Sequence, residues 1–201
     1  MESATWLEFV EAKEALRQAL GDDDAEELRL REKVMALVPK ALATLDEDPV
    51  DDAEHIWSMV GAYDMLSTIV ANSVRKSALA YVFVVNGIEK EHPDDLRAKW
   101  EAAKSGTLAE APVAVKDGFG DVHPDWTVDD ILKDAHANQE VHNNIVASLG
   151  SFWAKNKDRL FESDESEFDS CADQVKDVEA RTKSAYLDKC AEKKTVADAW
   201  E

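Results

Sequence analysis

Apolar residues recur every three or four positions along most of the chain, which is the spacing of one face of an α-helix. The pattern is strongest over 56–85, a stretch that carries only three formal charges and many small residues. Small residues allow neighbouring helices to approach closely. We predict a long apolar helix over 56–85, or a pair of helices broken near Asn72–Ser73, around which the other elements pack.

Amphipathic segments flank this stretch on both sides. Thr5 and Glu8 have the spacing of a capping box, which predicts a first helix that ends at Gly21. A second helix is expected to reach about Leu45, and Pro39 inside it is expected to kink or split it. Three further helices are predicted: a short one over 93–106, a long one over 127–160 and a last one from Ser163.

Two stretches depart from the helical pattern. Residues 81–90 combine aromatic and β-branched side chains with Asn86-Gly87, a dipeptide typical of β-hairpins. No second strand of matching length follows, so we favour helix there. Residues 105–126 contain glycines and two prolines and predict an irregular loop. The predicted fold class is all-α, a bundle of about six to seven helices around the helix at 56–85.

The chain length and the cysteines bound the organisation and the compartment. A chain of 201 residues suits a single helical domain over 1–201, or two lobes at 1–104 and 127–201. Cys171 and Cys190 fall in one predicted helix, roughly 28 Å apart along its axis, so they cannot bond to each other while it is intact. Thiols without a disulfide framework favour a reducing compartment. The N-terminus lacks the basic start of a signal peptide, and we predict a cytoplasmic, soluble protein.

Charge is the strongest compositional signal. The chain has 43 acidic and 23 basic residues, for a net charge of −20. The acidic excess lies in residues 1–60 and 121–201, whereas the middle is nearly neutral. Such a charge repels nucleic acids and anionic membranes and attracts basic protein surfaces. We therefore predict no direct contact with nucleic acid or membrane, and a basic protein surface as partner; a homo-oligomer is compatible with the sequence.

The acidic residues form three clusters, at 22–27, 46–54 and 162–169. We predict a non-enzymatic acidic helical protein that binds a basic surface, in its sharpest form a nucleic-acid mimic that inhibits a DNA- or RNA-binding protein. An assembly or adaptor protein whose acidity maintains solubility is an alternative. The predicted partner-binding residues are Asp22, Asp23, Asp24, Glu26, Glu27, Asp46, Glu47, Asp48, Asp51 and Asp52.

A second alternative is a helical-bundle enzyme or ligand binder. The pairs Asp52/His55 and Glu89/His92 have the carboxylate-x-x-His spacing with which helical bundles hold two metal ions. However, His55 lies in a first helical turn and His92 at a helix boundary, which favours solvated helix ends over metal ligands. No catalytic motif is present, and no cofactor is predicted.

Three further features carry weaker signals. Asp64 interrupts the apolar stretch, and if buried it needs an Arg or Lys from another helix or serves as a pocket carboxylate. His136 and Glu140 are one helical turn apart, a spacing typical of surface pairs. The six tryptophans are spread one per segment, which predicts core and inter-helix packing for all but Trp200, a candidate partner anchor. The remaining candidates are the loop residues Asp117, Asp121, His123 and Asp125, whose spacing fails the calcium-loop pattern.

Overall fold

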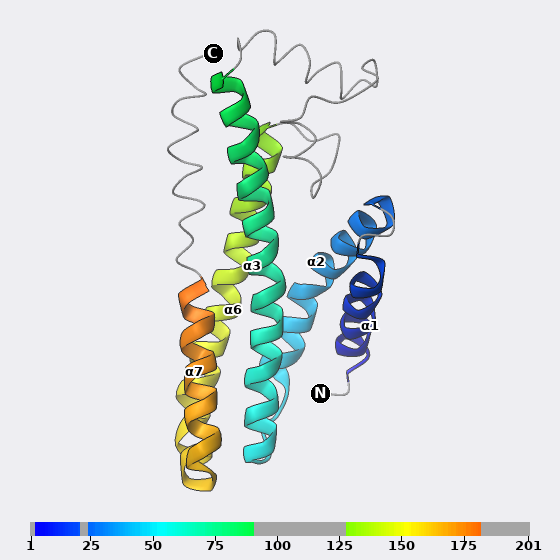
Figure 1. Cartoon of the computed structure of the whole chain (residues 1–201). Helices are drawn as coiled ribbons and strands as arrows, with labels where there is room; N and C mark the ends of the chain where they lie inside the picture. The colour runs from blue at the N-terminus through cyan, green and yellow to red at the C-terminus, as the bar shows by residue number, and fades with distance from the viewer. Residues whose placement is uncertain (1–2, 21–23, 91–127, 182–201) are drawn as a thin grey trace. The chain divides into compact units, whose positions relative to one another are not determined.

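The computed structural model describes residues 3–20, 24–90 and 128–181, apart from the side chains of 24, 79, 82–90 and 128. These residues form five α-helices: α1 Ala4–Ala19, α2 Asp24–Glu47, α3 Ala53–Lys90, α6 Val128–Ser163 and α7 Glu165–Arg181 (Figure 1). The described ranges contain no strand, so the all-α prediction is confirmed for them. The number of helices and the central position of 56–85 stay predictions. The predicted helix at 93–106, the loop at 105–126 and Cys190 lie outside the described residues.

Short polar side chains cap the helices. Ser3 Oγ accepts a hydrogen bond from the Trp6 backbone N–H at 3.1 Å, so α1 begins at Ala4 and the predicted cap at Thr5 is wrong. Ser3 has extended backbone angles, which leave its side chain free to turn back onto the first N–H groups. Asp52 and Asp164 play the same role for α3 and α7, where their Oδ1 atoms accept from backbone N–H groups.

Two helices are longer and more continuous than the sequence indicates. α2 passes through Pro39 without a break, so the predicted split does not occur. Pro39 faces solvent, whereas Val38 and Ala41 beside it are fully buried, and this packing offsets the backbone hydrogen bond that proline cannot donate. α3 continues through Asn72–Ser73 and through 81–90, so the break and the hairpin are both excluded.

The chain divides into two compact units. The first comprises Met1–Ala71 and Gln139–Lys183, and the second comprises Asn72–Asn138 and Ser184–Glu201. Since the boundaries fall inside α3 and α6, each unit combines sequence segments that are far apart. None of the helices in the described residues is both long and apolar enough to cross a membrane.

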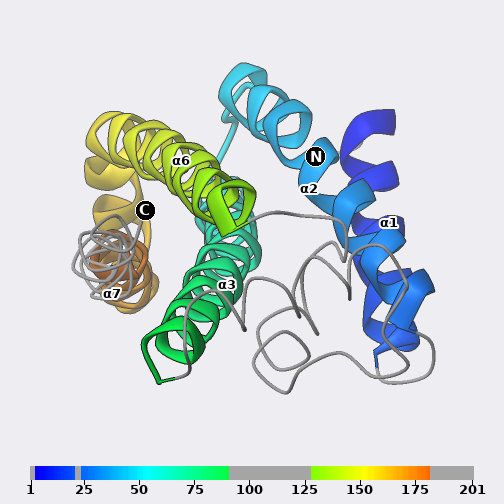
Figure 2. The ribbon, with the colours of Figure 1, turned by 90° about the horizontal axis from the view of Figure 1, so that it is seen from above.

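The first unit has a core to which all five helices contribute. α1 packs beside α2, and α7 lies antiparallel beside α6 (Figure 2). The predicted apolar face of 56–70 is buried in this core, including Ile56, Tyr63 and Leu66. Burying one such side chain contributes roughly 1.5–3 kcal/mol. The core also includes Trp6 and Phe9 from α1, Val38 and Leu45 from α2, Ile145 and Leu149 from α6, and Cys171 and Val178 from α7.

Two details of this packing differ from what the sequence predicts. Trp57 is 48% exposed, so the expectation that the tryptophans pack in the core fails at this position. Gly61 has no atom within 4 Å of the place where a Cβ would stand, so it does not serve close helix approach. Ala62 and Ser67, by contrast, are buried small residues as expected.

The second unit has a smaller described core. It is formed by Val74, Ala78 and Tyr81 of α3 and by Ile131 and Ala135 of α6. These α3 positions continue the three- and four-residue spacing seen in the sequence, so one face of α3 is apolar in this unit as well.

The cysteine of α7 is expected to be chemically inert in the folded protein. Cys171 is fully buried, and burial together with the nearby Glu167 carboxylate raises its pKa to about 11. Since the thiolate is the reactive species, we expect a thiol reagent to modify Cys171 at least about tenfold more slowly in buffer than in urea. The measurement is labelling of a Cys190→Ser variant. Equal rates in the two solvents would show that the thiol is accessible in the native state.

Candidate functional site

The first predicted acidic cluster is internally neutralised as far as it is described. Glu26 accepts two hydrogen bonds from the Arg29 guanidinium, at 2.5 and 2.7 Å, and Glu27 pairs with Arg31. Asp22, Asp23 and the Asp24 side chain lie outside the described residues. The arginines follow their partners by three or four positions, a spacing at which side chains on a helix meet. The carboxylates of Glu26 and Glu27 are therefore partly shielded from an external partner.

The second cluster is also tied to the fold. Asp46 accepts hydrogen bonds from the Tyr63 hydroxyl at 2.9 Å and the Ser148 hydroxyl at 3.1 Å. Asp52 caps α3 through the His55 N–H at 2.8 Å. Glu47 and Asp51 are exposed. Since the two clusters lie at opposite ends of the 24-residue α2, roughly 36 Å apart, they do not form one compact binding face.

Among the described residues, α7 carries the most regular row of exposed acidic side chains. Glu165, Asp169, Asp173 and Asp177 follow one another at four-residue spacing, and all four are exposed. On an α-helix this spacing places successive carboxylates about 6 Å apart along one inclined row. Lys176 pairs with Asp173 at 2.9 Å, and Arg181 turns inward to Asp64. The row begins inside the third predicted cluster, 162–169, and extends it along the helix.

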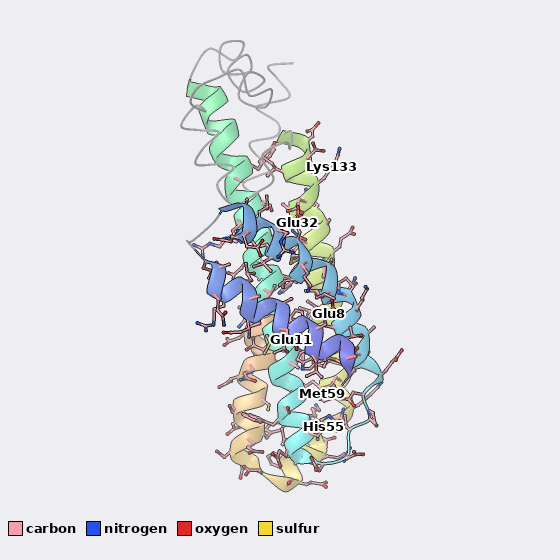
Figure 3. All side chains as sticks on the ribbon, turned by 90° about the vertical axis from the view of Figure 1, so that its right-hand side faces the viewer. Glu8, Glu11, Glu32, His55, Met59 and Lys133 are labelled. Atoms are coloured by element: carbon pink, nitrogen blue, oxygen red, sulfur yellow. The ribbon has the colours of Figure 1, made fainter. Side chains whose placement is uncertain are left out.

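The face formed by α1 and α2 has a different charge pattern. Figure 3 shows Glu8 and Glu11 on α1 and Glu32 on α2, and all three side chains are exposed. Basic residues are interspersed on the same two helices, and Lys33 lies 4.0 Å from Glu8. The acidic side chains of this face therefore do not form an uninterrupted row.

The residues proposed for metal binding are brought together only in part. His55 Nε2 lies 3.4 Å from Asp48 Oδ2, and Asp52 Oδ1 is engaged as the helix cap. His92 and the side chain of Glu89 lie outside the described residues. In the part of the chain that the structure describes, no group of three or more His, Cys, Asp or Glu side chains is placed to hold a metal ion.

Asp64 forms an ion pair with an arginine of another helix. Arg181 Nη1 donates to Asp64 Oδ1 at 2.5 Å and lies 3.0 Å from Thr68 Oγ1 and 3.3 Å from Ser67 Oγ. The side chains of Arg181 and Asp64 are 31% and 28% exposed. The last described residue of α7 is thereby fixed to the middle of α3. The sequence indicated that Asp64 needs a cationic partner, but 117 positions separate the two residues, and no local pattern identifies Arg181.

A buried histidine joins this polar cluster. His142 of α6 is 1% exposed, and its Nε2 lies 2.8 Å from Ser67 Oγ. His142 Nδ1 is buried and has no hydrogen-bond partner among the described residues. Burial and the positive charge of Arg181 lower the pKa of His142, so the neutral imidazole is favoured. The sequence predicted Ser67 only as a small packing residue and gave no signal for His142, since each sits singly in a helical pattern.

The pair Ser67–His142 has the separation of a nucleophile and its base, but its surroundings favour a structural role. Ser67 is fully buried, and it does not line the pocket that the structure describes at the end of α2. A hydrolytic triad needs a carboxylate on the second histidine nitrogen, and Asp64 is bound to Arg181 instead. We therefore assign Asp64, Ser67, His142 and Arg181 to a polar lock between α3, α6 and α7.

A second polar cluster lies in the second unit. Ser77 Oγ donates to Asp134 Oδ2 at 2.5 Å, and Asn138 Nδ2 donates to the same oxygen at 3.0 Å. Burial raises the pKa of Asp134, and the two hydrogen bonds oppose that rise. The cluster links α3 to α6, as expected of a buried carboxylate whose donors come from neighbouring helices.

The remaining candidates do not form a site in the described residues. His136 and Glu140 are both exposed on α6. Asp117, Asp121, His123 and Asp125 lie outside the described ranges. Comparison of the chain with protein-family models, with curated proteins and with solved structures gave no match.

Proposed function

We propose that the protein is a non-enzymatic acidic helical protein that binds a basic protein surface through α7. The observation that carries the proposal is the exposed row Glu165, Asp169, Asp173 and Asp177. Its carboxylates repeat about every 6 Å, close to twice the roughly 3.4 Å rise per phosphate in one strand of duplex DNA. A groove that binds a nucleic-acid backbone therefore suits the row, and a nucleic-acid mimic is the sharpest form of the proposal.

The net charge of −20 also supports binding to a basic protein surface. Long-range attraction accelerates the encounter with a basic partner, whereas the local row determines where that partner docks. The effect of net charge and the effect of the α7 row can be separated by experiment. Two variants can have the same net charge but lack carboxylates at different places.

We expect replacement of the α7 row by amides (E165Q/D169N/D173N/D177N) to weaken binding to a basic DNA-binding protein about tenfold or more, since each exposed pair contributes roughly 0.2–1 kcal/mol. The probe is a linker histone bound to fluorescent duplex DNA, and the measurement is displacement of that DNA at low salt. Displacement is expected to decline at high salt because exposed charges are screened.

The matched control removes four carboxylates elsewhere, as E8Q/E11Q/E32Q/E140Q. Both variants have a net charge of −16 instead of −20, because each loses four acids. The control is expected to retain displacement within about threefold, because it keeps the α7 row and most of the negative net charge. Equal losses in the two variants would show that net charge alone acts. A wild-type protein that displaces no DNA even at low salt would contradict the mimic.

A further inference from the structure

A pocket with a volume of about 440 Å³ opens on the first unit, where α2 ends and α6 passes. This volume lies within the range of roughly 300–1,000 Å³ that is typical of small-molecule sites. Its apolar wall is formed by Leu45, Tyr63 and Phe152, which are nearly or fully buried, and by the more exposed side chains of Val50 and Ala147. The ring centroids of Tyr63 and Phe152 lie 5.6 Å apart, so these two side chains pack against each other in the wall.

One side of the pocket favours a cation. Asp46 and Asp48 line it, and α2 ends beside them at Glu47 with no basic residue in its last turn. The C-terminus of a helix carries a partial negative charge, which adds to the two carboxylates. Tyr63 and Ser148 each donate to a different oxygen of Asp46 and hold the carboxylate in place. Each oxygen retains acceptor capacity for an ammonium group.

The α6 side of the pocket offers the opposite chemistry. Lys155 is exposed and lines the pocket, and no hydrogen bond or ion pair joins it to another described residue. Asn156 is 9% exposed and donates one amide hydrogen to the Phe152 carbonyl at 2.8 Å. Its remaining N–H is a donor for a carboxylate, and Lys155 supplies the countercharge.

We propose that this pocket binds a small zwitterion, a free α-amino acid with an apolar side chain. Its ammonium group lies against Asp46, with the engaged carboxylate of Asp48 adding to the negative potential, its carboxylate meets Lys155 and Asn156, and its side chain covers the apolar wall. The proposal is independent of the acidic row on α7, because none of the four carboxylates of that row lines the pocket.

The test uses the full chain and two probes, L-leucine and L-phenylalanine, observed by saturation-transfer NMR and titration calorimetry. We expect at least one of them to bind with a Kd of about 1 mM or tighter, as ligands of this size allow. Two analogues of phenylalanine each keep only one of its charged groups: phenethylamine keeps the ammonium and 3-phenylpropanoate keeps the carboxylate. Both are expected to bind at least about tenfold more weakly than phenylalanine, because each loses a charge-assisted contact.

Three variants locate the site. Asp46→Asn and Lys155→Met are each expected to weaken binding about tenfold or more. Lys157→Met removes an exposed lysine of the same helix that does not line the pocket, and it is expected to leave the Kd within about twofold. Lys155→Met changes only an exposed side chain, so it remains informative even if Asp46→Asn unfolds the protein.

Two results would overturn the proposal. Absence of binding by both amino acids shows that the pocket is not an amino-acid site. Binding of phenethylamine as tight as that of phenylalanine, unchanged by Lys155→Met, shows a site for simple ammonium ions.

Discussion

Replacement of Arg181 by methionine is expected to lower the free energy of unfolding by roughly 1–3 kcal/mol. The substitution keeps the aliphatic length but removes the guanidinium that Asp64, Ser67 and Thr68 share. Loss of one partner of a fully buried ion pair typically costs about 3–5 kcal/mol. The pair here is about 30% exposed, so water rehydrates the Asp64 carboxylate in part and the cost falls. Urea unfolding followed by circular dichroism measures the change.

Arg29→Met is the matched control for this experiment. It also removes one arginine from an ion pair with a carboxylate, but Arg29 and Glu26 are 63% and 43% exposed. A pair this exposed contributes at most about 0.5 kcal/mol. The double variant Asp64→Asn/Arg181→Met is expected to be less destabilised than the sum of its single changes, since the two residues interact directly. Equal effects of Arg181→Met and Arg29→Met would contradict the polar lock.

Acidification below pH 6.5 is expected to destabilise the wild-type protein relative to a His142→Gln variant. The pKa of His142 is lowered in the folded state by burial and by the charge of Arg181, from an ordinary value of 6.5. The unfolded chain therefore takes up a proton as the pH falls through 6.5, whereas the folded protein resists it. The stability difference is fully present above pH 6.5 and declines toward the folded-state pKa by at most about 1.4 kcal/mol per pH unit.

Comparison of variants isolates this contribution from the many carboxylates of the chain. Asp134 acts in the opposite direction, because burial raises its pKa and protonation relieves its desolvation. Wild type and His142→Gln share Asp134, so its effect cancels in their difference. His136→Gln removes an exposed histidine of the same helix and is expected to follow the wild-type pH profile. A His142→Gln profile parallel to that of wild type would contradict a buried neutral histidine.

The sequence by itself determined the helices of the described residues. The spacing of Ile56, Val60 and Tyr63 places them on one face, and the structure buries all three. Such periodicity is a local property, so it can be read without knowledge of any neighbour. Helix ends depended on single side chains, and the sequence placed the first cap at Thr5 where Ser3 performs it. Pro39 and Asn72–Ser73 each predicted a break, but α2 and α3 continue through these positions because the buried residues on both sides of them pack in the core.

Only the tertiary structure decided which polar residues meet. Asp64 signalled a missing partner, yet Arg181 lies 117 positions away and Ser67 and His142 are 75 positions apart. The same holds for the pocket, which joins Asp46 to Ser148 and places Lys155 on its wall. A sequence shows the charge of each acidic cluster. Whether those carboxylates bind other residues of the fold or face solvent depends on which helices pack together. At the described ends of α2, Glu26, Glu27 and Asp46 are hydrogen-bonded within the fold, whereas Glu47 is exposed. The row on α7 faces solvent because only its opposite side, with Cys171, Val175 and Val178, is apolar.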